Sequence, residues 1–183
     1  MNAKPNLPNK TTRATVTTLA LKNAGVVLLN NYIPILFNRL GLTNENQFID
    51  NQAAGKAVQY LQFLITGQSA TEDICLPLNK VLCGLPLAQS VPQEIDISNN
   101  EQQLIEGLIN AVINYWKDIG TSSVSGFRGN WLIREGLLTE TEERWELTVE
   151  KRPYDLLISR SSFSFSIIKH PWMPKPLHVN WPY

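Results

Sequence analysis

The sequence predicts an α+β fold, in which a mainly helical body carries a small antiparallel sheet in the C-terminal third. Two observations favour the helical body. Apolar residues recur at steps of three and four between positions 23 and 119, and Ser98 is followed three residues later by Glu101, the pattern of a capping box. A third observation favours the sheet, because apolar and polar residues alternate in RWELTVEK, residues 144–151.

Length and composition fit one folded domain. Of the 183 residues, 43% are hydrophobic and 17% are charged. We expect residues 1–13 to form a flexible arm and residues 14–183 to form a single domain. The formal net charge is zero, which argues against nucleic-acid or anionic-membrane partners and favours self-association. No apolar run reaches the roughly 18 residues of a membrane span, and the first residues lack the apolar segment of a signal peptide.

The elements expected in the first half are one strand and several helices. Weak alternation in residues 14–22 is typical of a short strand. Residues 23–42 carry an apolar helical face, but Pro34 predicts a break between two short helices near Tyr32 and Ile33. Two further helices, each followed by a glycine, are predicted at residues 47–65 and 71–83.

The second half predicts two more helices and then a change of period. The helices are expected at residues 98–119, which have a wide apolar stripe, and at residues 123–135. Three strands are expected after them, at residues 144–151, 153–160 and 162–169. In the last of these, Phe163, Phe165 and Ile167 alternate with serines.

No group of side chains predicts a catalytic, metal or cofactor site. His170 and His178 lie in a proline-interrupted segment without a third ligand nearby. No nucleophile-elbow, phosphate-loop or dinucleotide motif occurs. The sequence therefore predicts that the chain is not an enzyme and needs no cofactor.

Other reactive residue types have ordinary interpretations. The carboxylates of Glu140, Glu142 and Glu143 are typical of a solvated turn. Arg128 and Arg134 are interpreted as surface residues or as one side of a salt bridge to a partner. The two cysteines, Cys75 and Cys83, are interpreted as small buried thiols in a reducing compartment.

The C-terminal segment HPWMPKPLHVNWPY, residues 170–183, is unusually rich in aromatic residues and proline. It holds two of the five tryptophans, four of the eleven prolines and both histidines. Proline lowers the entropy that an extended chain loses on docking, and tryptophan is enriched at interfaces. We expect an ordered strap that packs either on its own domain or on a partner.

Several motifs together resemble the contractile injection system tape measure protein family. They are NAGVVLL, YLQFLITG, LPLNKVLCGLPL, VINYWKDIGTSSVSGFRGNWLIREG, WELTVE, and SIIKHPWM with HVNW. The resemblance covers roughly residues 20–181. Such systems are phage-tail-like machines in which a contracting sheath drives an inner tube through a target.

The resemblance implies a structural role without catalytic residues. Members of the family lie in the tube lumen during assembly, help to start tube polymerisation at the baseplate, and set tube length. The expected partners are tail tube and baseplate proteins, with assembly in the bacterial cytoplasm and with self-association of the chain. The expected interface is exposed apolar surface in the C-terminal segment and in the Tyr115–Trp131 region, namely Tyr115, Trp131, Trp172, Met173 and Trp181.

Two features depart from that family pattern. A ruler needs a long segment, whereas this chain is spent on short helices in a compact domain. SRSSF, residues 159–163, stands where an aromatic-rich step is expected. Two other classes of function therefore remain open: an adaptor or chaperone for an effector, cargo, tube or baseplate protein, and, with less support, a small hydrolase.

Overall fold

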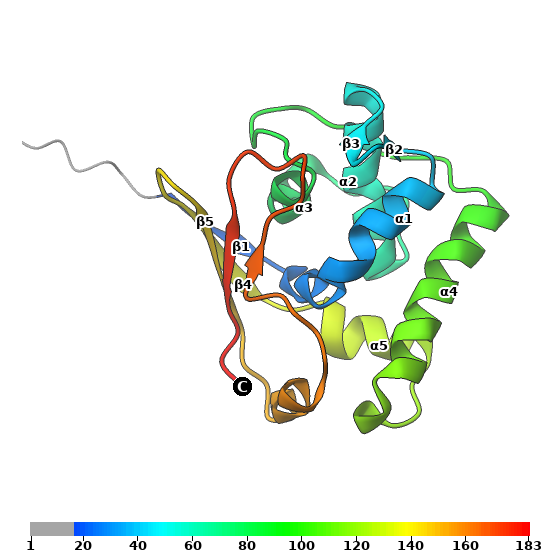
Figure 1. Ribbon diagram of the computed structural model, residues 1–183, viewed down its shortest axis with the longest axis vertical. Helices are drawn as coiled ribbons and strands as arrows, with labels where there is room; N and C mark the ends of the chain where they lie inside the picture. The colour runs from blue at the N-terminus through cyan, green and yellow to red at the C-terminus, as the bar shows by residue number, and fades with distance from the viewer. Residues whose placement is uncertain (1–16) are drawn as a thin grey trace, which may run out of the picture.

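The computed structural model describes residues 17–183, in which a curved sheet lies against one side of a group of helices (Figure 1). The predicted arm at residues 1–13 and the start of the predicted first strand lie outside the described residues. The sheet has five strands in the order β1-β4-β5-β7-β6. Their bounds are Thr18–Leu21, Gly136–Glu140, Trp145–Val149, Leu177–Asn180 and Ile167–Ile168.

The predicted fold class is wrong in its account of the sheet. The sheet is mixed and not antiparallel. Strands β5 and β7 pair in parallel, whereas the pairs β1–β4, β4–β5 and β6–β7 are antiparallel. It is also not confined to the C-terminal third, since β1 pairs with β4 through Thr18 and Thr139. A local pattern cannot show such a pairing, because the partner strand lies more than a hundred residues away.

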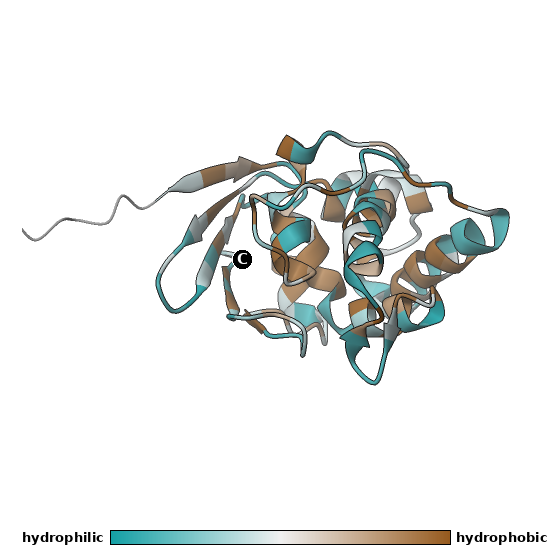
Figure 2. Cartoon of the chain, turned by 90° about the horizontal axis from the view of Figure 1, so that it is seen from above, coloured by the Kyte–Doolittle hydropathy of each residue, from teal (hydrophilic) through white to brown (hydrophobic). Residues whose placement is uncertain are grey.

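The sheet buries one face only. In β5, Trp145, Leu147 and Val149 point inward and are buried, as the alternation predicted. On the inner side, Gly136 of β4 lies so close to Ala24 that an added Cβ would stand 2.7 Å from the Cβ of Ala24. Seen from above, the helices lie on this side of the sheet, and no helix of residues 17–183 covers the other side (Figure 2).

The first helical segment breaks where proline predicts. A 3-10 helix, η1 (Ala24–Tyr32), leads directly into α1 (Ile33–Arg39), and Pro34 stands in the first turn of α1. Proline fits there because the first turn needs no N–H from it. Next comes a hairpin that no sequence pattern predicted, β2 (Thr43–Asn44) with β3 (Gln47–Phe48). Its turn residues Glu45 and Asn46 both have positive φ, which is typical of a tight two-residue turn.

The central helix is α2 (Asn51–Thr66), which is buried on nearly all sides. It begins later than predicted because Asp50 caps it, accepting a hydrogen bond from the Ala53 N–H at 2.7 Å. It ends as predicted, at Gly67 with φ of 77°. The predicted helix at 71–83 is divided into a 3-10 turn, η2 (Asp73–Cys75), and α3 (Pro77–Leu82).

The helix predicted at 98–119 is α4 (Asn99–Tyr115), followed by a 3-10 turn, η3 (Lys117–Ile119). Its capping box is confirmed, with Ser98 and Glu101 each bonding the other's backbone. The helix predicted at 123–135 is shorter, because α5 (Val124–Phe127) passes into a π-helical turn, η4 (Arg128–Leu132).

Two of the three predicted C-terminal strands are wrong or displaced. Residues 153–160 form a 3-10 helix, η5 (Asp155–Arg160), and not a strand. In the last predicted strand only Ile167 and Ile168 pair, and Ile167 faces outward while Ile168 is buried. The sequence did not predict strand β4, because its residues GLLTE do not alternate between apolar and polar. In the structure only Leu138 among them is buried.

Candidate partner interface

The five residues of the predicted interface occupy different environments. Trp131, Met173 and Trp181 are buried within the chain, and Trp172 is partly buried. Tyr115, at the end of α4, is 63% exposed. In this conformation, Tyr115 is therefore the member of the set that offers most of its side chain to a partner.

The C-terminal segment packs on its own domain. The Trp172 indole donates a hydrogen bond to the Leu82 carbonyl at 2.8 Å, and its ring lies 5.0 Å from that of Phe48. Gly84 lets the segment approach, because a Cβ there would stand 2.2 Å from the Trp172 carbonyl oxygen. In this structure Trp172 packs on its own domain, the first of the two alternatives that the sequence left open.

A buried ion pair anchors the end of the segment. Arg134 and Asp155 are completely buried and form two hydrogen bonds, at 2.7 and 2.9 Å. The Trp181 indole donates to the same Asp155 carboxylate at 2.9 Å. Burial would raise the pKa of Asp155, but hydrogen bonds from Arg134 and Trp181 outweigh it and hold the pKa below its ordinary value.

Aromatic rings surround this pair. The Arg134 guanidinium lies 5.2–5.5 Å from the ring centres of Trp131, Tyr154 and Trp181. The interpretation of Arg134 as a surface or intermolecular residue is therefore wrong. Arg128 is also used internally, because it donates to the carbonyls of Phe63 and Leu64.

A second buried polar group joins three segments and was missed from the sequence. Asn23 donates to Gln62 and to Asn79, at 3.1 and 3.0 Å, and Asn79 donates to Gln62 at 3.1 Å. Beside it, the ammonium of buried Lys80 binds Asp73 at 2.6 Å. The sequence signal for this buried group is one amide residue in each of three apolar motifs. Asn23 is in NAGVVLL, Gln62 in YLQFLITG and Asn79 in LPLNKVLC. Three of the motifs that carry the resemblance thus meet through these hydrogen bonds.

The remaining titratable groups do not converge. His170 is buried and stacks on Trp172, and burial lowers its pKa to about 4. His178 lies on β7. Within residues 17–183, no group of three or more His, Cys, Asp or Glu side chains is placed to hold a metal ion. Cys83 is buried, but Cys75 is exposed, so its interpretation as a buried thiol is wrong.

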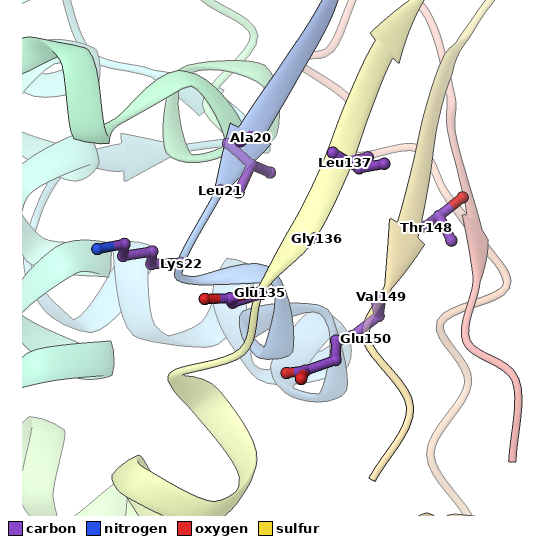
Figure 3. A pocket seen from close by; sticks show the side chains of 9 residues that line it. All are labelled: Ala20, Leu21, Lys22, Glu135, Gly136, Leu137, Thr148, Val149 and Glu150. Carbon is purple, nitrogen blue, oxygen red and sulfur yellow. The ribbon is translucent and has the colours of Figure 1, made fainter.

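Among the surface hollows of the described residues, two with mainly apolar linings are candidates for partner binding. One is a hollow of about 460 Å³ where β1 and β5 end and β4 begins. Ala20 and Leu137 come from the strands, and the charged side chains of Lys22, Glu135 and Glu150 lie at the strand ends (Figure 3). The other is a groove of about 490 Å³ between α1 and α4.

Comparison with known families decides the class of the protein. The model of the contractile injection system tape measure protein family matches residues 1–181 of the chain. The chain belongs to this family.

A contractile injection system tape measure protein is a structural component of the tail particle, associated with other tail components. No curated protein and no solved structure matches this family member. Among its described residues, none of the helices has the length and apolar character needed to cross a membrane.

Proposed function

We propose that this tape measure family member acts without catalysis, as an assembly component in the lumen of the tail tube. The family match over residues 1–181 carries the proposal. The use of polar side chains supports it, because Arg134, Asp155 and Lys80 are buried and bonded within the chain. Their hydrogen bonds hold segments together and leave the exposed surface for docking.

The dimensions of the domain favour tube initiation over length measurement. The longest described helix, α4, has 17 residues and is about 25 Å long. A ruler must extend along the tube, whereas a compact unit of this size suits one end of it. These residues therefore act where the tube starts, by contacting the first tube subunits and the baseplate.

Recovery from assembled particles tests this assignment. An affinity tag belongs at the N-terminus, because Trp181 near the C-terminus is buried and bonded to Asp155. Particles purified by sedimentation from producing cells are expected to yield the tagged chain together with tube and baseplate proteins. An untagged strain gives the background.

Two results would contradict the proposal. One is a tagged chain that is made in the cell but never recovered with particles or with their assembly intermediates. The other is recovery of the chain with a single effector and no tube protein, which would assign it to the adaptor class.

A further inference from the structure

The groove between α1 and α4 has the form of a helix-packing surface. Its two walls carry lining residues at helical spacing, three or four apart, so each wall is one face of a helix. The wall from η1 and α1 consists of Tyr32, Ile35, Leu36 and Arg39, and the wall from α4 consists of Gln103, Leu104, Gly107, Leu108 and Ala111. Arg39 is the one charged residue in this lining.

Gly107 forms a notch in the α4 wall. It lies in the middle of the helix, where glycine costs roughly 1 kcal/mol relative to alanine. A Cβ at Gly107 would meet nothing within 4 Å, whereas one at Gly25 would stand 1.8 Å from the Trp131 carbonyl oxygen. Packing within the described chain therefore explains Gly25 but does not explain Gly107. The notch is space that a second surface can fill.

A protrusion lies in the same groove. Ile35 is 54% exposed and lines the wall that faces Gly107. A face that carries both a protrusion and a notch fits a second copy of itself after a two-fold rotation.

The two ends of the groove are also complementary to each other. At one end lies Tyr32, and Tyr115 follows Ala111 by one helical turn on the same face of α4. At the other end Arg39 lies near Gln103, because α1 and α4 run in opposite directions (Figure 1). Within residues 17–183, no carboxylate forms an ion pair with Arg39. A guanidinium over tyrosine rings is a favourable contact.

We propose that a second copy of this chain binds in the groove and forms a two-fold symmetric dimer. Ile35 of each copy packs against Gly107 and Ala111 of the other, and Arg39 of each copy reaches the other's tyrosine end. The surface has free access, because α4 lies at the end of the molecule farthest from the sheet (Figures 1 and 2). The formal net charge of zero adds no repulsion between copies.

Sedimentation equilibrium on the purified chain tests the dimer. The unmodified chain is expected to show twice the monomer mass at micromolar concentration. Ile35→Asp and Gly107→Phe are each expected to weaken the dimer at least about tenfold, by adding a charge or by filling the notch. Leu137→Asp is the matched control, because Leu137 is 52% exposed but lies on the sheet. Circular dichroism and thermal melting check that each variant is folded.

Cysteine cross-linking tests the symmetry of the contact. In a Cys75→Ser background, which removes the exposed thiol, an Ile35→Cys chain is mixed with a Gly107→Cys chain and oxidised. A disulfide between the two variants is expected, and none when Leu137→Cys replaces Ile35→Cys. A monomer at every concentration, or a dimer that Leu137→Asp disrupts while Ile35→Asp does not, would overturn the proposal. Either result would leave the role in the tail particle untouched.

Discussion

At the residue scale, Asp155 joins three parts of the chain through one carboxylate. It accepts hydrogen bonds from Arg134, from the Trp181 indole and from the Arg152 backbone N–H. Removing one partner of a buried ion pair leaves the other charge uncompensated. The last residues of the protein therefore depend on a contact made in its interior.

We predict that Asp155→Asn lowers the free energy of unfolding by about 3–5 kcal/mol. Urea denaturation followed by tryptophan fluorescence measures it. Glu146→Gln is the control, because Glu146 pairs with Arg144 on the exposed surface, where such pairs contribute less than about 1 kcal/mol. Equal losses in the two variants would contradict the assignment of Asp155 as an anchor.

His170 predicts how stability depends on pH. Burial lowers its folded pKa to about 4 from an ordinary value of 6.5. Above pH 6.5, His170 is neutral in both states. As the pH falls from 6.5 to 4, the unfolded chain takes up the proton first, so stability falls by up to about 3 kcal/mol.

The measurement is the free energy of unfolding from urea titrations at several pH values. His170→Phe keeps an aromatic ring beside Trp172 and is expected to remove most of the slope between pH 4 and 6.5. Asp155 and Glu101 do not account for the upper part of this window, because their pKa values in the folded chain lie below 3.8 and 4.5 and their contributions are lost at lower pH. A slope unchanged in the variant would contradict the role given to His170.

At the element scale, two glycines with opposite surroundings test how the helices pack. Gly25 lets η1 contact the backbone of η4 at Trp131, whereas Gly107 faces open space on α4. We predict that Gly25→Ala destabilises the chain by several kcal/mol, on the order of the largest core substitutions, because backbone must move. Gly107→Ala is expected to stabilise it by about 0.5–1 kcal/mol.

Thermal and urea unfolding of both variants decide the matter. A Gly25→Ala chain as stable as the unmodified protein would contradict the close contact of η1 and η4. A destabilised Gly107→Ala chain would contradict the open groove.

Elements with local causes were predictable from the sequence. The capping box of Ser98 and Glu101 and the break at Pro34 each depend on residues within a few positions, and both are confirmed. The pairing of β1 with β4 and the parallel pairing of β5 with β7 depend on distant segments, so no local pattern contains them. The 3-10 helix η5 begins at Asp155, and the bond of this side chain to Arg134, 21 residues earlier, is a contact that no local pattern contains.

At the scale of the whole molecule, the sequence identified the family but not which of the predicted interface residues are buried. The quoted motifs predicted the family, and the family match confirms it. What they could not show is that Trp131, Met173 and Trp181 are buried, because aromatic residues suit a core as well as an interface. Exposure is decided by the whole fold, which leaves the groove and the outer face of the sheet as open surfaces.

The most direct test of the role in tube assembly is the number and length of tubes, measured by electron microscopy, after deletion of this chain in the producing cell. We predict that particles disappear or fall sharply in number, because tubes are not started, and that a plasmid copy of the unmodified chain restores their number. Particles of normal number and normal length in the deletion strain would contradict the account, whether they are loaded or empty.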